Sequence, residues 1–217
     1  AGFGWPLIHR LWPPPVVIVQ QPGRSATRPF LQLVLGIAAL LVLDGALGRL
    51  GLLSGWNGGG AIVLTAIGIG LLAVQLARAL PRPISACRPS VSSLHPLVWF
   101  AAPAAAILFL AAVTPPGWLW ASEFGGYDVL SYHLQLPREW LALGRIQGLE
   151  QNVYSYLPSS MEAAYLHLAA LTGDAHQAAI PAQILHALLA LLAAIGTGLA
   201  IRPHAGVRAG ALAFGLV

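Results

Sequence analysis

The sequence predicts an all-α fold: a polytopic bundle of transmembrane helices with interfacial helices in a long outer loop. Of its 217 residues, 57% are hydrophobic and 8% are charged, whereas a soluble domain carries roughly 25% charged residues. Apolar stretches long enough to cross a hydrocarbon core of about 30 Å as helices recur along the chain. Six of the seven acidic residues fall between positions 115 and 174. These observations predict a membrane protein whose chemistry is concentrated in one loop.

Residues 1–29 are predicted to form a Pro-rich cytosolic arm. They contain PPP and QQPG and have no apolar run long enough for the core of a signal peptide. The chain begins without Met and ends inside the apolar run ALAFGLV. We therefore expect it to be part of a longer protein.

Residues 30–114 are predicted to hold three transmembrane helices, and residues 175–217 a fourth helix and a truncated fifth. By length and composition the spans are Phe30–Leu47, Ala61–Leu80, Pro96–Thr114 and Ala175–Ile201, with the fifth beginning near Gly206. Pro103 is predicted to bend the third span. The stretch GWNGGG at 55–60 lacks the Lys of a phosphate-binding loop and is predicted to be the turn between the first two spans.

The basic residues, all of them Arg, predict the orientation. Counted on alternate sides of the predicted spans, the eleven divide into eight and three. Because an excess of basic residues marks the cytoplasmic side, we expect a cytoplasmic N-terminus and an extracytoplasmic loop at 115–174. The arginines are scattered singly and form no basic face, so the predicted partner is the lipid bilayer and not nucleic acid.

Helix signals divide the outer loop into short interfacial helices. Asp128 is positioned to cap a helix over Val129–Leu136, and Pro137 suits the first turn of a second helix that Gly144 ends. The run SSME at 159–162 is a capping box for a helix that reaches Leu171, with Gly173 beyond its end. Asp174 and Gln177 repeat this device before the fourth span. The Trp and Tyr residues of the loop, Trp140 among them, are of the types that settle at the headgroup level.

Asp128 is the candidate catalytic residue, because a carboxylate on the outer face can act as a general base towards a hydroxyl group. The alternative is a helix cap, which spacing alone favours. His133, five residues on, is a candidate for phosphate contact or proton transfer. Its alternative is an interfacial His that points at water or headgroups, which the residues alone favour.

Arg138 and Arg145 are candidate phosphate-binding residues. The alternative for both is pairing with lipid phosphates or with Glu139 and Glu150. Glu123 is a candidate second acid, although solvation in the loop is the favoured reading.

His167 and His186 lie on apolar helices and are predicted to be satisfied inside the bundle. No metal site is predicted, because Cys87 is the single Cys and Asp128 with His133 makes a weak ligand set. Whether a divalent metal is needed as cofactor stays open.

The runs GYDVLSYHLQLPREWLALGRI and NVYSYLPSSMEAAYLHLAAL, followed by an Ala/Leu-rich span with a His, resemble the first outer loop of bacterial membrane glycosyltransferases. These form the GT-C superfamily, and the branch is the one similar to dolichyl-phosphate-mannose-protein mannosyltransferases. The resemblance covers about residues 115–202 and includes the pair Tyr132–His133.

This resemblance implies a multi-span enzyme of the bacterial inner membrane that moves a sugar from a polyprenyl-phosphate donor to an acceptor hydroxyl, usually with inversion at the sugar carbon. It implies Asp128 as the acid that deprotonates the acceptor. Tyr132, His133, Arg138 and Arg145 are the candidate contacts to substrate or phosphate. Val129 stands where the mannosyltransferases often have a second acid.

The alternative function is a polytopic transporter or a non-catalytic membrane scaffold. A transporter places ionisable residues within its spans near the midplane. The predicted spans carry few polar groups, among them Asp44 near the end of the first. This scarcity favours the enzyme.

Overall fold

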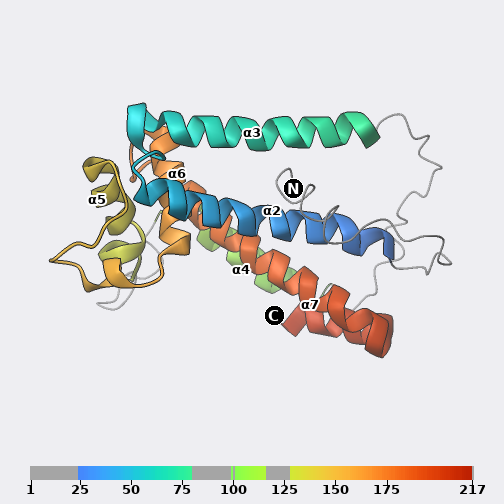
Figure 1. The fold of residues 1–217 in the computed structure, drawn as a ribbon. Helices are drawn as coiled ribbons and strands as arrows, with labels where there is room; N and C mark the ends of the chain where they lie inside the picture. Colours follow the sequence, from blue (N-terminus) through green and yellow to red (C-terminus); the bar gives the residue numbers. More distant parts are fainter. Residues whose placement is uncertain (1–23, 80–98, 100, 116–127, 217) are drawn as a thin grey trace.

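The computed structural model of the chain describes residues 24–79, 99, 101–115 and 128–216. It confirms the predicted all-α fold (Figure 1). Three of its helices are long and apolar enough to cross a membrane, over Arg28–Arg49, Gly55–Ala77 and Ala179–Arg202. The predicted N-terminal arm lies mostly outside the described residues, as do Glu123 and Cys87.

The first two spans are antiparallel helices joined by a tight turn. Helix α2 (Arg24–Arg49) leads into α3 (Gly55–Ala79), whose first residues are not helical, because Trp56, Asn57 and Gly58 all have positive φ. The predicted turn at GWNGGG is therefore confirmed. A Cβ at Gly58 would lie 2.1 Å from the carbonyl oxygen of Ala170, so only glycine allows the turn to approach its neighbouring helix this closely.

The third predicted span is seen only in part. Helix α4 (Ala102–Val113) has 12 residues, which gives a length of about 18 Å at 1.5 Å per residue. Residues 80–98 and 100 lie outside the described chain. Pro103 lies in the first turn of α4, where its missing N–H costs no helical hydrogen bond. The predicted bend at Pro103 depends on residues outside the described chain and stays a prediction.

The outer loop folds into a head, residues 128–174, at one end of the long helices (Figure 1). It contains the short π-helix η3 (Val129–His133), α5 (Gln135–Leu143), the 3-10 turn η4 (Val153–Tyr156) and α6 (Ser160–Thr172). The helix-ending roles predicted for two glycines are confirmed, because Gly144 and Gly173 both adopt the left-handed conformation.

Helix α6 is the centre of the head and is covered by other helices of the chain. It packs against α2, α3, α5 and α7, and most of its residues from Glu162 to Ala170 are buried. Trp140 of α5 is fully buried against this core, and its indole N–H donates to the carbonyl oxygen of Gln147 at 2.8 Å. The prediction that Trp140 settles at the headgroup level is therefore wrong.

A buried polar network joins α2, α3 and α6. The Asp44 carboxylate lies 2.6 Å from Nδ1 of His167, and the other ring nitrogen of His167 lies 2.8 Å from the Thr65 hydroxyl. Asp44 is 1% exposed and His167 6% exposed. The prediction that His167 is satisfied inside the bundle is confirmed, whereas the partnership of Asp44 was not foreseen.

Helix α7 (Ala179–Leu216) packs against α4 and carries the last long span. It breaks at Gly206, where φ is 85°, and the break falls where the sequence predicts the start of a fifth helix. The segment after the break turns back on α7, since a Cβ at Gly198 would lie 2.9 Å from the carbonyl oxygen of Gly210. Asp174 accepts a hydrogen bond from the backbone N–H of His176 at 2.9 Å, ahead of the helix.

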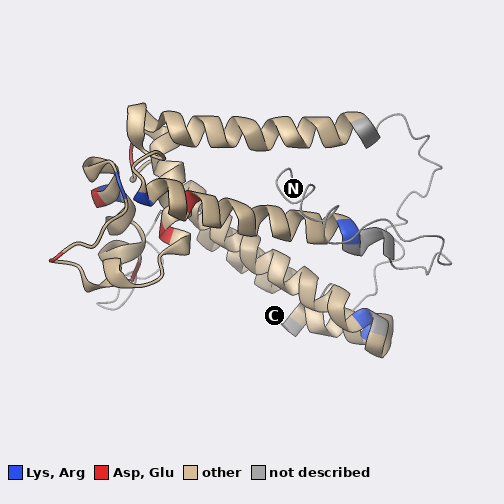
Figure 2. Cartoon of the chain, in the orientation of Figure 1, with Lys and Arg blue, Asp and Glu red and all other residues tan. Residues whose placement is uncertain are grey.

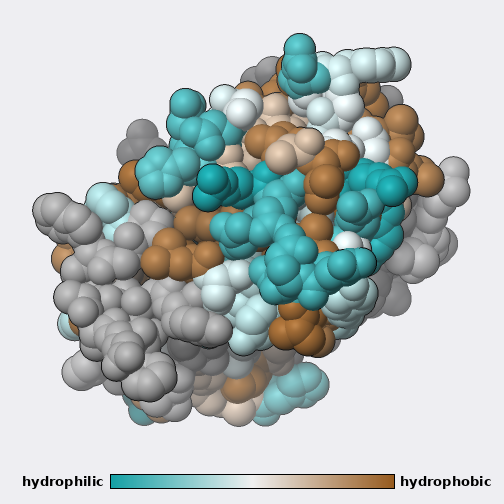
Figure 3. Space-filling model, turned by 90° about the vertical axis from the view of Figure 1, so that its left-hand side faces the viewer, coloured by the Kyte–Doolittle hydropathy of each residue, from teal (hydrophilic) through white to brown (hydrophobic). Residues whose placement is uncertain are grey.

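Charged residues divide between the two ends of the molecule. Among the described residues, the acidic ones lie in or beside the head, whereas arginines lie both there and near the far ends of α2 and α7 (Figure 2). Seen from the head end, hydrophilic side chains gather on the surface with apolar ones between them (Figure 3). The long helices expose apolar side chains such as Ile67 and Ile69, as expected of helices in contact with lipid.

Candidate functional site

A cavity of about 340 Å³ lies where the head meets the long helices, between η3, α4, α6 and α7. Most of its wall is apolar, with Ala and Leu side chains from α4 and α7. The polar side chains that line it are Asp128, His133, Tyr165, Gln183 and His186. A largely apolar cleft with a few convergent polar groups is the usual form of a small-molecule site.

The π-helix places two of the predicted site residues on this cavity. The backbone N–H of Leu134 donates to the carbonyl oxygen of Val129, five residues back, at 2.9 Å. In an α-helix of 3.6 residues per turn, residues five apart point about 140° away from each other. The wider π-turn brings Asp128 and His133 closer to one face, and both line the cavity. Such turns occur frequently at functional sites.

Asp128 does not cap the helix that follows it. Its backbone is helical, with φ −60° and ψ −41°, and its side chain makes no capping hydrogen bond. A capping side chain requires a non-helical backbone at this position, so the alternative reading of Asp128 as a cap is wrong. The residue is exposed, and it is one of the residues that line the cavity.

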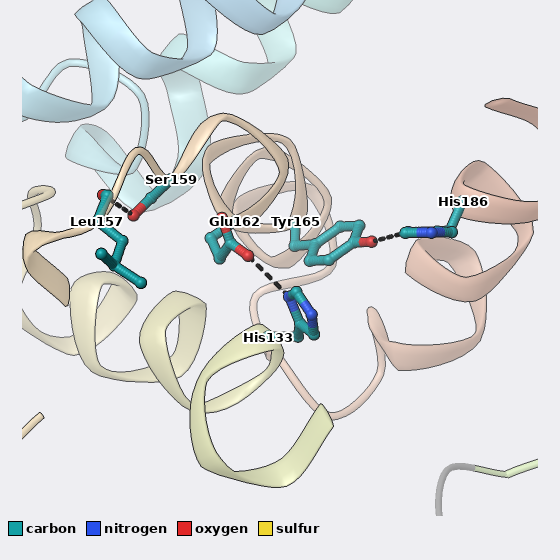
Figure 4. Close-up of polar contacts among 6 residues, drawn as sticks. All are labelled: His133, Leu157, Ser159, Glu162, Tyr165 and His186. Atoms are coloured by element: carbon teal, nitrogen blue, oxygen red, sulfur yellow. Dashed lines mark hydrogen bonds and ion pairs between the residues drawn. The ribbon is translucent and has the colours of Figure 1, made fainter. Parts of the chain in front are cut away.

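His133 pairs with an acid instead of pointing at water or headgroups. Its Nδ1 lies 2.7 Å from the carboxylate of Glu162, which is 7% exposed (Figure 4). Ser159 donates its hydroxyl to the carbonyl oxygen of Leu157 at 2.8 Å and makes no cap. The predicted capping box is therefore wrong, because Glu162 reaches across to η3 instead of back to its own helix.

Tyr165 and His186 form a second hydrogen-bonded pair on the cavity wall. The Tyr165 hydroxyl lies 3.0 Å from Nδ1 of His186 (Figure 4). Burial, followed by the nearby charge of Glu162, raises the pKa of Tyr165 to about 12. The phenol is therefore protonated at neutral pH, and it can donate to the imidazole or accept from it, depending on the tautomer of His186. His186 is exposed, so the prediction that it lies inside the bundle is wrong, although its Nδ1 is satisfied.

The other predicted site residues lie outside the wall of this cavity. Tyr132 stacks on Tyr154 with ring centroids 4.5 Å apart and leans on the His133 ring at 4.1 Å. Burial, with the charges of Asp128 and Glu162, raises the pKa of Tyr132. Tyr132 therefore packs against the ring of His133 and does not itself line the cavity.

The two arginines of the head are exposed. Nε of Arg145 donates to the side-chain oxygen of Gln147 at 2.8 Å. Glu139, a predicted partner of the arginines, instead accepts hydrogen bonds from Gln135 and Gln151. Neither Arg138 nor Arg145 lines the cavity with Asp128.

Sequence reasoning missed Tyr165, Gln183 and the role of Glu162. The spacing of Glu162 and Tyr165, three residues apart, places both on one helix face, and this was the available signal. Gln183 Oε1 is buried without a hydrogen-bond partner in the described structure, which marks it as a group that a ligand would satisfy. Within the described residues, no three His, Cys, Asp or Glu side chains are grouped to hold a metal ion.

Comparison of the chain with protein-family models, with curated proteins and with solved structures finds no match in any of the three.

Proposed function

We propose that this chain is part of a membrane glycosyltransferase that moves a sugar from a polyprenyl-phosphate donor to an acceptor hydroxyl at the outer face of a bacterial inner membrane. The observation that carries the proposal is the position of Asp128. Asp128 lines a largely apolar cavity at the junction of the head and the long helices. Asp128 is also the residue that matches the catalytic acid in the resemblance described above.

The setting of the cavity suits a lipid-linked substrate. An isoprenoid tail requires apolar walls, and here α4 and α7 supply them. A sugar requires hydrogen-bonding groups, and η3, α6 and α7 supply these at the same place. In the proposed reaction, Asp128 takes the proton of the acceptor hydroxyl as its oxygen attacks the sugar carbon and the polyprenyl phosphate leaves.

The experiment compares sugar transfer from a polyprenyl-phosphate donor by the wild-type protein and by Asp128→Asn in reconstituted membranes. Loss of a general base lowers the rate by roughly 10²- to 10⁴-fold. Glu150→Gln is the matched control, because Glu150 is an exposed acid of the same head that does not line the cavity. Equal rates for Asp128→Asn and the wild type would refute the role of Asp128.

The position of Asp44 bears on the alternative of a transporter. It lies five residues before Arg49, at the end of α2, which is about 8 Å of helical rise. Its partner His167 belongs to α6 of the head. The buried pair is therefore close to one end of this candidate span, whereas transport sites lie near the midplane.

A further inference from the structure

One face of α6 orients two histidines that come from different elements. Glu162 and Tyr165 are three residues apart on this helix, and each hydrogen-bonds the Nδ1 atom of an imidazole. The first imidazole is His133 of η3 and the second is His186 of α7 (Figure 4). Both histidines line the cavity that Asp128 lines. Their Nδ1 atoms are occupied, so their Nε2 atoms are the groups available to a ligand.

The two partners allow opposite hydrogen-bonding roles on the two rings. A carboxylate only accepts hydrogen bonds, so Glu162 requires a proton on Nδ1 of His133, and Nε2 of a singly protonated ring is then an acceptor. The Tyr165 hydroxyl can either donate to Nδ1 of His186 or accept from it. In the arrangement in which it donates, Nε2 of His186 carries the proton, and the cavity presents one imidazole acceptor and one imidazole donor.

We propose that His133 and His186 together bind one hydroxyl group of the donor sugar. The hydroxyl donates its hydrogen to Nε2 of His133, and its oxygen accepts the Nε2–H of His186. This inference rests on the proposed function and assigns the two histidines to recognition of the sugar, while Asp128 acts on the acceptor. Both histidines are binding residues in this scheme, and α6 is the element that orients them.

The charges around the cavity favour a neutral hydroxyl over the donor phosphate at this position. Asp128 lines the cavity and Glu162 lies directly behind His133, so two carboxylates would oppose an anion there. The polar lining residues of the described chain include no Arg. Carboxylates and imidazoles match sugar hydroxyls, and Gln183 adds an amide oxygen, unpaired in the described structure, that accepts from a further hydroxyl. At about 340 Å³, the cavity is in the size range of small-molecule sites.

The test measures binding of two lipids to the protein in nanodiscs: undecaprenyl phosphate, and undecaprenyl phosphate that carries a single hexose. The hexose is taken from a panel of glucose, mannose and galactose. Wild-type protein is expected to bind one sugar-bearing lipid more tightly than the bare phosphate. In His186→Ala, this preference is expected to fall by about 3- to 10-fold, the worth of one hydrogen bond, with the affinity for undecaprenyl phosphate unchanged.

Two further variants are measured in the same way: His186→Gln as the conservative substitution and His176→Ala as the control. Glutamine keeps an N–H donor and is expected to restore part of the preference. His176 is exposed and does not line the cavity, so His176→Ala is expected to behave as the wild type. Thermal unfolding of each variant shows that it is folded.

Two outcomes overturn the inference and leave the proposed function standing. In the first, His186→Ala loses affinity for undecaprenyl phosphate itself, which would place the phosphate at the histidines. In the second, the wild type transfers sugar but His186→Ala keeps the full preference for the sugar-bearing lipid. A wild-type protein that binds no sugar-bearing lipid and transfers no sugar overturns both proposals.

Discussion

The Asp44→Ala substitution removes the carboxylate at the junction of α2, α3 and α6. Asp44 is 1% exposed and lies 2.6 Å from His167, which is itself buried. Removal of one partner of a buried pair leaves the other uncompensated and costs about 3–5 kcal/mol. At roughly 2–4 °C per kcal/mol for a domain of this size, we expect the unfolding temperature to fall by about 6–20 °C. The measurement is thermal unfolding in detergent, followed by size-exclusion chromatography.

Two further variants separate the pair from its surroundings. Thr65→Val removes a single neutral hydrogen-bond partner of His167 and is expected to cost about 1 kcal/mol. Replacement of both members, Asp44→Leu with His167→Leu, removes the buried polar groups together and is expected to recover most of the stability, because apolar replacement of a buried pair is often neutral. If the double variant were as unstable as the sum of its single variants, the two residues would not be coupled and the reasoning would be refuted.

Three other predictions concern the turn, the core and the cavity wall. Gly58→Ala is expected to lower the free energy of unfolding by more than about 2 kcal/mol, because φ is +83° and the new Cβ would meet a backbone oxygen of α6. Gly55→Ala is the control, because Gly55 has open space around it, and thermal unfolding is expected to show no change. Trp140→Ala is expected to lower the free energy of unfolding by about 3–5 kcal/mol. Trp56→Ala, at a site 94% exposed, is expected to lower it by under about 0.5 kcal/mol. Equal losses for the two variants would contradict the burial of Trp140. Burial raises the pKa of Tyr165 from 10.0 to about 12. The protonated phenol therefore contributes about 2–3 kcal/mol to the free energy of unfolding below pH 10, and this contribution is lost as the pH rises to 12. The unfolding temperature of Tyr165→Phe is expected to lack that loss, and an identical pH profile would refute the assignment.

Periodicity and capping signals predicted most of the elements. The lengths of the apolar runs gave the helices that contain Arg28–Arg49 and Ala179–Arg202, and Gly144 and Gly173 marked helix ends through their need for positive φ. These signals are local, because each is carried by a few neighbouring residues. The division of the chain into helices therefore follows from the sequence.

The partners of the polar side chains were not predictable in the same way. Glu162 satisfies the local pattern of a capping box, yet it bonds His133, 29 residues away. Asp44 and His167 are 123 residues apart, and no local pattern relates them. The π-helix before the cavity depends on hydrogen bonds of unusual register, which composition does not encode. Tertiary contact decides each of these cases.

The opposite faces of α6 have a thermodynamic consequence. One helix of 13 residues carries Glu162 and Tyr165 towards the cavity and His167 towards the span junction. A ligand that tightens the cavity side therefore restrains the same rigid segment that holds α2 and α3 together. A bound ligand is therefore expected to raise the free energy needed to unfold that junction. By reciprocal linkage, a substitution that loosens the junction is expected to reduce the binding free energy of the ligand by the same amount.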